Sequence, residues 1–327
     1  MCNQPNPYEN YRLSIVIINY KTPEMVTDCI ASLLPELEGI DAIVQIVDND
    51  SNDGSVDKIR QWLNAHVTKQ KINLIESGGN LGFSGGNNVG IKAARADYYL
   101  LLNSDTLVRT GSVKALLATV EQYPQAGLVS PRLEWPDGTP QISCFRFHTP
   151  FSELILSARS YPVTRLLDGY QVPLPVSDTV VHPEWASFAC IMVRREVFDA
   201  IGLMDDGFFM YYEDSEFCYQ ARKAGWDIIY MPTARVVHLR GGSSPVKERT
   251  RQNKRLPRYY YESRTRYFYK LYGRAGITAA NLLWHCGRLI SLLRELVGSK
   301  EPHICESQWR DIWINFWNPL KPYKLPK

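Results

Sequence analysis

The sequence predicts an α/β fold, a doubly wound and mostly parallel sheet flanked by helices, followed by a basic and largely helical C-terminal extension. Near-continuous apolar runs of strand length alternate with helical patterns, which is typical of parallel strands that helices cover on both faces. Polar clusters follow the ends of these runs, and Lys and Arg concentrate towards the C-terminus. The 327 residues, 45% hydrophobic and 22% charged, have a globular composition that excludes disordered and fibrous classes.

The expected elements alternate along the first third of the chain. Each apolar run ends at a polar cluster or a turn, and each segment between two runs has the spacing of a helix. We expect strands at 13–20, 42–48, 71–76 and 97–103, and helices at 24–34, at 55–65 and in a segment that ends at 94.

Later segments are less uniform. Residues 131–183 are rich in proline and weakly periodic, so we expect an irregular insertion there. Regular patterns return at 185–198, then as a helix within 208–226 and as a strand at 227–232. The predicted domains are residues 1–245, which include the insertion, and an extension over 246–327.

Cysteine usage and the N-terminal segment predict a cytoplasmic protein. The seven cysteines are scattered and form no C-x-x-C pair, so we expect reduced thiols. The first residues, MCNQPNPYENYR, lack the apolar centre of a secretory signal. No apolar run reaches the roughly 18 residues that a spanning helix needs. We therefore expect no integral membrane segment.

Positive charge concentrates in residues 235–274, which hold 12 Lys or Arg against two Glu, a net +10, while the whole chain carries +3. The remaining residues therefore sum to −7. Seven Tyr or Phe lie within this block, which is expected to face an anion: a diphosphate, a lipid head group or a nucleic acid. Residues 277–297 are amphipathic, and two interpretations stay open: attachment to a membrane surface, or packing on the domain or across a dimer interface.

Polar clusters mark three strand ends: Asn19 and Tyr20, then Asp48, then Asn103 and Asp105. Ligands of doubly wound sheets bind beyond the carboxyl ends of the strands, so one site is expected there. Asp48 can hydrogen-bond a nucleobase or a ribose. Asp105 can ligate a hard divalent cation together with phosphate oxygens and waters. Turn formation and helix capping explain the same residue types equally well.

The run SGGNLGFSGGNNVG, residues 77–90, suggests a nucleotide site, because glycines let the backbone approach phosphates and the next helix offers its positive N-terminus. No three of its glycines have the G-x-G-x-x-G spacing, and Gly85 and Gly90 precede Ile91 where a P-loop has Lys. These mismatches remove support for a Rossmann dehydrogenase or a P-loop NTPase. A turn that only reverses the chain is the alternative.

Two further features carry titratable groups. Glu213 and Asp214 begin a predicted helix, where carboxylates are favourable against the helix dipole. The same pair, beside aromatic residues, can supply a general base that stays ionised near neutral pH. His238 follows a β-rich run; a lone histidine is more often structural, but next to a carboxylate it suits Mg²⁺ or Mn²⁺.

The order of these motifs resembles inverting family 2 glycosyltransferases of the GT-A fold, closest to the bacterial rhamnosyltransferase-like branch. The resemblance covers residues 13–244, more than two thirds of the chain. The matching segments are IVIINY, VDNDSNDGS, GGNLGFSGGNNVG, LLNSDT, WASFACIMVRRE, FFMYYEDSEFCYQARKAGW and ARVVHLRGGSS. Each is weakly specific alone, and seven in this order are strongly specific.

The resemblance implies roles for individual residues. Asp214 matches the catalytic base, and Asp105 and His238 match the metal ligands, although Asn103 stands where the fuller acidic motif has a carboxylate. Trp185 begins a motif that usually reads W-x-S-G-A, and Phe188 replaces its glycine, which bears on the acceptor pocket. Trp185 and Glu213 are assigned to the acceptor side. The implied donor-binding residues are Asn19, Tyr20, Asp48, Asn80, Gly82, Asn87, Asn88, Asn103 and Asp105.

The implied reaction moves a sugar, with rhamnose the best candidate, from a nucleoside diphosphate to an acceptor hydroxyl with inversion. The resemblance implies a divalent cation, Mg²⁺ or Mn²⁺, as cofactor. It also implies a saccharide or polyprenyl-diphosphate-linked acceptor in bacterial surface polysaccharide synthesis, and hence an inner-membrane surface as a partner.

Two other interpretations stay open. A degenerate GT-A scaffold is compatible with Asn103 and Phe188. Nucleic-acid binding through the basic aromatic block is the other alternative, but no RNP, KH or helix-turn-helix signature accompanies that block, so we expect no nucleic-acid partner. The sequence does not specify the oligomeric state.

Overall fold

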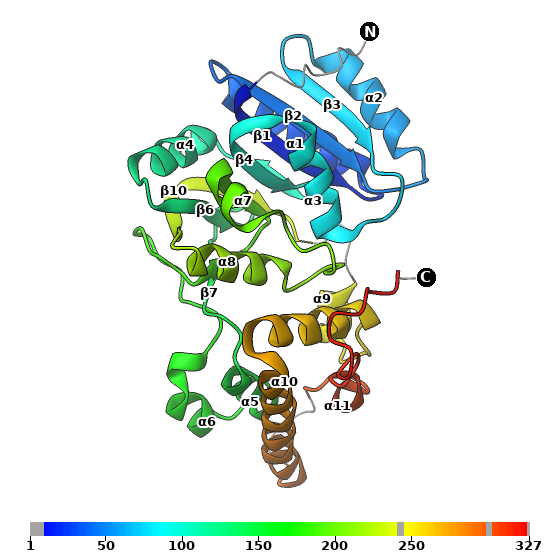
Figure 1. Ribbon diagram of the computed structural model, residues 1–327, viewed down its shortest axis with the longest axis vertical. Coiled ribbons are helices and arrows are strands. Elements are labelled where there is room, and N and C mark those ends of the chain that lie inside the picture. Colours follow the sequence, from blue (N-terminus) through cyan, green and yellow to red (C-terminus); the bar gives the residue numbers. More distant parts are fainter. Residues whose placement is uncertain (1–9, 241–244, 299–302, 326–327) are drawn as a thin grey trace. The chain divides into compact units, whose positions relative to one another are not determined.

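The computed structural model describes residues 10–240, 245–298 and 303–325, which fall into two compact units (Figure 1). The first unit lies within residues 1–144, 175–206 and 217–243, and the second within 145–174, 207–216 and 244–327. Helix α8 (Glu213–Lys223) begins in the second unit and continues into the first. The domain limits predicted above stay a prediction.

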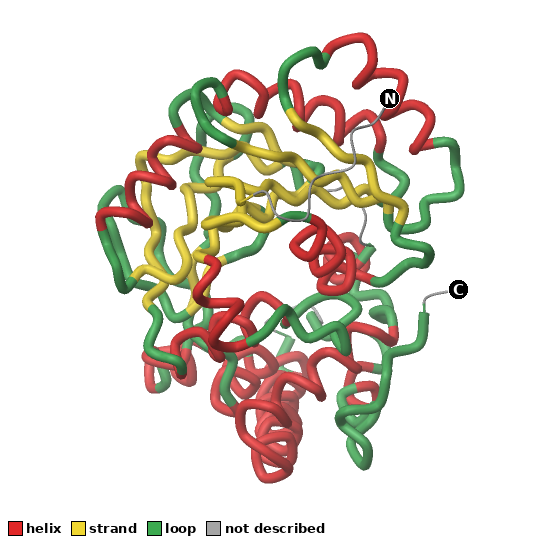
Figure 2. The backbone as a smooth tube through the Cα atoms, turned by 45° about the horizontal axis from the view of Figure 1, so that its top comes forward, coloured by secondary structure: helices red, strands yellow, loops and turns green. Residues whose placement is uncertain are grey.

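The first unit is built on an eight-stranded sheet in the order β3-β2-β1-β4-β9-β6-β10-β5. Figure 2 shows its strands as one twisted layer. Neighbours from β3 to β4 and the pair β6 and β10 are parallel, whereas β9 runs antiparallel to both β4 and β6, and β5 runs antiparallel to β10. The strands are β1 (Asn10–Asn19), β2 (Ala42–Asp48), β3 (Lys71–Glu76), β4 (Arg95–Asn103), β5 (Thr106–Val108), β6 (Ala126–Glu134), β9 (Cys190–Arg194) and β10 (Asp227–His238). The predicted α/β class is confirmed, in the form of a mixed sheet.

Helices cover both faces of this sheet. Alternate residues of β1, Leu13, Ile15 and Ile17, share one apolar core with helices α1, α2 and α4, because successive strand side chains point to opposite faces. Helices α3, α7 and α8 lie on the other face, where Phe198 of α7 packs against Tyr99 of β4. The covering helices are α1 (Pro23–Leu33), α2 (Ser55–His66), α3 (Gly82–Ala93), α4 (Ser112–Gln122) and α7 (Arg195–Ile201), and a short 3₁₀ turn, η1 (Leu34–Leu37), follows α1.

The glycine-rich run has a packing role. At Gly90 of α3, a Cβ atom would lie 2.4 Å from Cγ1 of Val16 on β1. Only glycine therefore lets α3 approach the sheet this closely. This contact explains one glycine of the run without a ligand.

The second unit is mainly helical. Its long helix α10 (Arg258–Leu296) is kinked at Gly273, which has the positive φ of 66° that glycine tolerates best. The largely helical C-terminal part agrees with the prediction. The other elements that lie wholly within this unit are α5 (Pro150–Ala158), α6 (Tyr161–Leu166), η2 (Asp168–Tyr170), α9 (Val246–Arg251) and α11 (Gln308–Asp311); β7 (Cys144–Phe145) lies at the boundary, and β8 (Trp185–Ala186) belongs to the first unit.

Residues 131–183 are more regular than their sequence indicates. They contain the end of β6 and the helices α5 and α6. Helix α5 begins with a capping box, in which Thr149 and Ser152 hydrogen-bond each other's backbone, and Pro150 occupies its first turn. These helices are too short for a clear helical pattern in the sequence, since α5 has nine residues and α6 has six.

Four aromatic rings of the basic aromatic block, residues 235–274, are buried and therefore do not face an anion. Tyr259, Tyr261, Tyr267 and Phe268 are buried in the second unit. Several cations of the block are bound to carboxylates of the chain: Arg255 to Asp311, Arg258 to Glu262, Arg264 to Glu153 and Lys270 to Glu216. The expectation that these aromatic residues form a binding surface is therefore wrong, because they fill a hydrophobic core.

Two absences apply to the described residues only. None of their helices is both long and apolar enough to cross a bilayer. None of their six cysteines forms a disulfide bond. Cys2, and the Gly241–Ser244 end of the last matching segment, lie outside the described residues.

Candidate functional site

The ends of β1 and β2 hold a buried carboxylate. Asn19 and Asp48 are neighbours in the register of the two strands. The Nδ2 atom of Asn19 donates to Oδ1 of Asp48 at 2.6 Å and to Oγ of Ser51 at 3.0 Å, and Ser51 Oγ donates to Asp48 Oδ1 at 2.6 Å. Because all three residues are buried, the orientation of the Asp48 carboxylate is fixed before any ligand binds.

The glycine-rich loop is tied to the same strand end through Asn49. Its Nδ2 donates to the carbonyl oxygen of Gly82 at 3.0 Å and to Oδ1 of Asn80 at 3.3 Å, while its Oδ1 accepts from the Leu81 amide at 3.0 Å. Two predicted donor-binding residues, Asn80 and Gly82, are therefore held next to β2. Asn49 was not among the predicted site residues. Its position directly after Asp48 is the feature of the sequence that could have identified it.

Asp105 and His238 meet at the ends of β4 and β10. Nε2 of His238 lies 3.5 Å from Oδ1 of Asp105, and each residue is 8% exposed. The Leu239 amide donates to the Asp105 carbonyl oxygen at 2.9 Å. Oγ1 of Thr22 lies 3.2 Å from Oγ of Ser104, which links this corner to the loop after β1. The structure thus brings Asn19, Asp48, Asp105 and His238 to one edge of the sheet.

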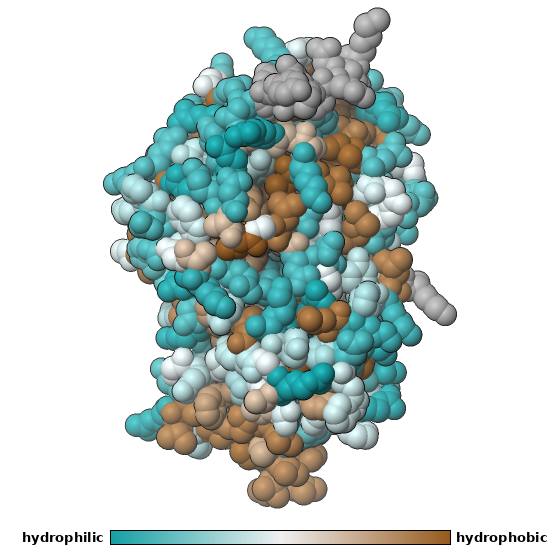
Figure 3. Space-filling model, viewed as in Figure 1, coloured by the Kyte–Doolittle hydropathy of each residue, from teal (hydrophilic) through white to brown (hydrophobic). Residues whose placement is uncertain are grey.

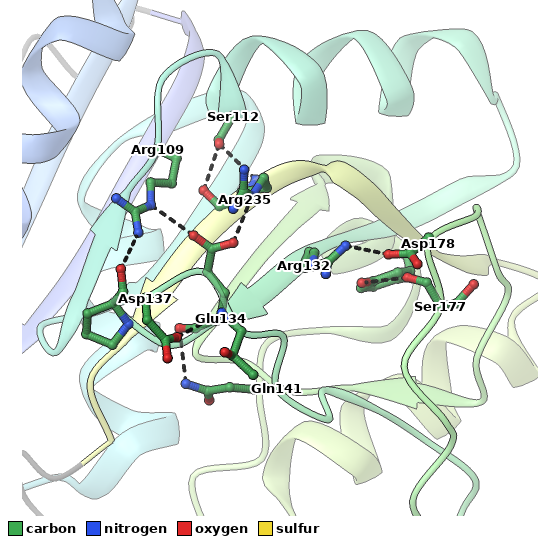
Figure 4. A network of polar contacts seen from close by, with 12 residues as sticks. Arg109, Ser112, Arg132, Glu134, Asp137, Gln141, Ser177, Asp178 and Arg235 are labelled. Atoms are coloured by element: carbon green, nitrogen blue, oxygen red, sulfur yellow. Dashed lines mark hydrogen bonds and ion pairs between the residues drawn. The ribbon is translucent and has the colours of Figure 1, made fainter.

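A polar network behind His238 fixes the strand that carries it. Glu134 of β6, fully buried, accepts from Nε of Arg109 at 2.9 Å and from Nε of Arg235 at 2.8 Å (Figure 4). Nε2 of Gln141 donates to the carbonyl oxygens of Glu134 at 3.1 Å and His238 at 2.7 Å. Removing one partner of a buried ionic group lowers the stability of the fold. The network therefore holds β10, and with it His238, in place. Sequence reasoning did not single out these residues, since no local pattern relates them.

Arg240 adds positive charge near Asp105. Its Nε donates to Oε1 of Gln141 and its guanidinium lies 5.5 Å from the ring centre of Trp135. Burial lowers the pKa of Arg240 and the charge of Asp105 opposes that shift, so the guanidinium stays charged near neutral pH. It therefore offers a cation at the edge where an anionic ligand is expected. Arg240 was not among the predicted site residues, although it lies within the matching segment two residues after His238.

The other four predicted donor-binding residues contact neighbouring parts of the folded chain. Asn88 forms a pair of bonds with the Met204 backbone, at 2.8 Å and 3.1 Å, and Asn87 donates to the Phe83 carbonyl within α3. Lys21 lies over the ring of Tyr20. The backbone of Asn103 accepts from Oγ1 of Thr106 at 2.7 Å. The donor roles of these four residues, and those of Asn19, Asp48, Asn80, Gly82 and Asp105, stay predictions.

Trp185, predicted for the acceptor side, is buried in β8, and Phe188 is 2% exposed, with its ring 5.9 Å from that of Phe217 in an edge-to-face contact. The residue that replaces the motif's glycine therefore fills the core of the first unit. An aromatic ring in this position adds packing area, and its substitution by glycine would leave a cavity.

Glu213 and Asp214 begin α8 in the second unit. The Ser215 amide donates to Oδ1 of Asp214 at 2.8 Å. Glu213 is 7% exposed, and its Oε2 atom has no hydrogen-bond partner among the described residues. Burial, and then the charge of Asp214, raise the pKa of Glu213 well above its ordinary value. A buried carboxyl group with a raised pKa beside a second carboxyl group is an arrangement that occurs at acid–base sites.

Helix α10 fixes the first turn of α8. Oγ of Ser215 donates to the hydroxyl of Tyr267 at 3.3 Å, and Nζ of Lys270 lies 2.7 Å from Oε1 of Glu216. Both partners come from the basic aromatic block. The block therefore positions the segment that carries Glu213 and Asp214, a role that its composition did not reveal.

The raised pKa of Glu213 predicts a pH-dependent gain from Glu213→Gln. The folded state holds the proton above the carboxyl group's ordinary pKa of about 4.3, so wild-type stability falls as pH rises through that value towards the folded pKa. Glutamine removes this loss. We expect a higher melting temperature than wild type at pH 8 and a similar one at pH 4, measured by circular dichroism.

The matched control is Glu306→Gln, at an exposed position of the second unit. Its melting temperature should follow that of wild type at both pH values. A Glu213→Gln protein no more stable than wild type at pH 8 would contradict a protonated Glu213.

Comparisons with known proteins agree with this geometry. The structure aligns with the mannosyltransferase PcManGT from Pyrobaculum calidifontis, solved in complex with GDP-Man and Mn²⁺, with a TM-score of 0.53 and 14% identity over 96% of this chain and 87% of that one. This likeness identifies the fold as GT-A-like. The model of the glycosyl transferase family 2 matches residues 14–202, and the chain belongs to that family.

Curated relatives share the family. The chain is 32% identical over 231 residues to the low-salt glycan biosynthesis hexosyltransferase Agl10 of Haloferax volcanii, covering 69% of this chain and 66% of the relative. It is 28% identical over 247 residues to the N-acetylglucosaminyl-diphospho-decaprenol L-rhamnosyltransferase of Mycobacterium tuberculosis, covering 71% and 77%. The resemblance stated from the motifs is confirmed.

Proposed function

We propose that this protein transfers a sugar, with inversion, from a nucleoside diphosphate to a saccharide or a lipid-linked saccharide. The observation that carries the proposal is the edge where the fixed Asp48 carboxylate and the Asp105–His238 pair lie together. A nucleotide needs polar partners for its ribose and base, and its diphosphate needs positive charge. The Asp48 cluster fits the first requirement, and Arg240 with a cation held by Asp105 and His238 fits the second.

The residues present fit a divalent cation. Nδ1 of His238 is buried and has no hydrogen-bond partner among the described residues, while Nε2 faces the Asp105 carboxylate. Nε2 is therefore the nitrogen that could hold a cation together with Asp105. No group of three or more His, Cys, Asp or Glu side chains in the described parts of the chain forms a full metal cage. A Mg²⁺ or Mn²⁺ ion would stabilise the charge of the departing diphosphate.

Asp214 serves as the general base in this proposal. It removes the proton from the acceptor hydroxyl as that oxygen forms its bond to the anomeric carbon and the bond to the diphosphate breaks. A single displacement inverts the anomeric centre. Glu213, neutral through its raised pKa, can donate a hydrogen bond to the acceptor, and Trp185 lines the acceptor side.

The proposed donor is dTDP-rhamnose and the proposed acceptor a polyprenyl-diphosphate-linked sugar. Two observations support this choice: the relative from Mycobacterium tuberculosis is named for rhamnose transfer to a sugar on decaprenyl diphosphate, and the second unit carries excess positive charge that suits an anionic lipid surface. Surface polysaccharide synthesis on the cytoplasmic face of a bacterial inner membrane follows from these two choices.

Donor binding tests the proposal. We expect dTDP-rhamnose with Mn²⁺ or Mg²⁺ to raise the melting temperature of the protein and EDTA to remove that rise. Ligand at 100 times its Kd adds about 2.7 kcal/mol to the free energy of unfolding. UDP- and GDP-linked sugars and free nucleotides serve as competitors in the same thermal-shift screen.

The matched variants are Asp105→Asn and Asp199→Asn, the latter at an exposed position of the first unit. Asp105→Asn should abolish the metal-dependent part of the shift, and Asp199→Asn should keep it. Absence of any shift with every donor would leave a GT-A scaffold without donor binding and refute the proposal.

A further inference from the structure

The C-terminal half of α10 exposes a stripe of leucines. Leu282, Leu289, Leu293 and Leu296 are 54%, 62%, 64% and 82% exposed. Their spacings of seven, four and three residues place them on one side of the helix. The opposite side carries Trp284, Gly287 and Ser291, which are buried. The amphipathic segment therefore does pack within its own unit, and its leucine stripe remains uncovered among the described residues.

Helix α5 packs on the side of α10 that is opposite to this stripe, so the leucines face away from α5. At Gly287 of α10, a Cβ atom would lie 2.6 Å from the Leu154 carbonyl oxygen, so α10 and α5 are in tight contact. Nη1 of Arg294 donates to the Ala158 carbonyl oxygen at 2.9 Å, at the end of α5. Figure 3 shows hydrophobic side chains gathered at the end of the second unit where α10 ends. We call the leucine stripe of α10 the apolar face; its residues are Leu282, Leu289, Leu293 and Leu296.

The charges around the apolar face are mainly positive. Arg288 is paired with Glu295, and Glu153 is paired with Arg264 in the interior. The remaining charged side chains of α5, α6 and the α10 half, with the residues directly after each helix, are Arg159, Arg165 and Arg294 against Asp168. Within its limits the second unit holds 20 Lys or Arg and 11 Asp or Glu, a net +9, which leaves −6 for the first unit.

We infer that the apolar face docks on the surface of an anionic lipid bilayer. A helix whose apolar side enters the boundary between head groups and acyl chains binds through its buried apolar area and through attraction of its cations to anionic lipids. The exposed leucines and the net positive charge of the second unit supply these two contributions. The purpose of this docking rests on the proposed function, because a lipid-linked acceptor would lie in such a surface.

Charge favours a bilayer over a second copy of the chain. In a two-fold dimer the same patch meets itself, so two units of net +9 would repel each other. An anionic lipid surface attracts the same positive charge. The complementarity therefore points to lipid.

Flotation of the full chain with vesicles tests the inference. The vesicles contain phosphatidylcholine alone or phosphatidylcholine with phosphatidylglycerol. The test variant is Leu289→Glu/Leu293→Glu, both at exposed positions, so the fold is expected to persist. The matched control is Leu320→Glu/Leu325→Glu, two leucines 47% and 59% exposed elsewhere in the second unit, with the same change in charge.

We expect wild type and the control to float with the anionic vesicles, and the fraction of the test variant that floats to fall by about tenfold or more. Wild type that stays at the bottom of the gradient, or a test variant that floats equally well, would overturn the inference. A dimer that sediments without lipid and that only the test variant dissociates would assign the face to a second copy instead.

Donor binding, measured by thermal shift on the same proteins without lipid, separates this inference from the proposed function. A protein that floats but binds no nucleotide sugar refutes the proposed function and leaves the docking face standing. A protein that binds donor but does not float does the reverse.

Discussion

Replacing Asp214 with asparagine is expected to lower the rate of sugar transfer by about 10²- to 10⁴-fold, the usual contribution of a general base. Asparagine keeps the shape of the side chain and can still accept from the Ser215 amide, but it cannot take a proton from the acceptor hydroxyl. Donor binding should persist, because in the proposed mechanism Asp214 acts on the acceptor. Transfer of labelled rhamnose from dTDP-rhamnose to a polyprenyl-diphosphate-linked sugar measures the rate.

Asp168→Asn is the control for this experiment, since Asp168 is an exposed carboxylate of the same unit. It should transfer sugar at the wild-type rate. Turnover of Asp214→Asn equal to that of wild type would remove Asp214 from the role of base and direct attention to Glu213.

Breaking the ion pair of Glu153 and Arg264 is expected to cost about 3–5 kcal/mol of folding free energy, because the remaining charge is left buried. Nη2 and Nε of Arg264 lie 2.8 Å and 3.2 Å from Oε2 of Glu153, and both side chains are almost completely inaccessible. Nη1 of Arg264 donates to Oδ1 of Asn281 at 2.8 Å. Glu153→Ala removes the counter-charge in this three-residue network between α5 and α10. Guanidinium unfolding followed by circular dichroism measures the loss.

The exposed pair of Glu248 and Arg251 provides the comparison, with side chains 52% and 77% accessible. Glu248→Ala should change the free energy of unfolding by less than about 1 kcal/mol, since solvent screens this pair. The double variant Glu153→Leu/Arg264→Met should recover much of the loss, because neither charge remains buried. Equal losses in Glu153→Ala and Glu248→Ala would show that the buried pair is not required for stability.

The sequence alone determined the strand and helix order of the first part of the chain. The observed β2 and β3 coincide with the predicted 42–48 and 71–76, because buried parallel strands leave a continuous apolar signature that is local. The polar strand ends at Asn19, Asp48 and Asp105 were equally legible, since the carboxyl edge of such a sheet is where ligands bind. The motifs in their order also identified the family.

Only the tertiary structure decided which of these groups meet. His238 is 133 residues from Asp105 in the sequence, and their proximity depends on the antiparallel pairing of β5 with β10, which no periodicity predicts. The buried Glu134 looks like any charged residue until Arg109 and Arg235 are placed beside it.

The same limit applies to the C-terminal part. Its tyrosines and arginines suggested a binding surface, but burial, which is a property of the packed chain, assigned Tyr267 and Lys270 to holding the first turn of α8. The packing of Gly287 against α5 determines which side of α10 faces outward. Composition and spacing determine elements and residue types, whereas long-range packing determines which side chains are buried, paired or exposed.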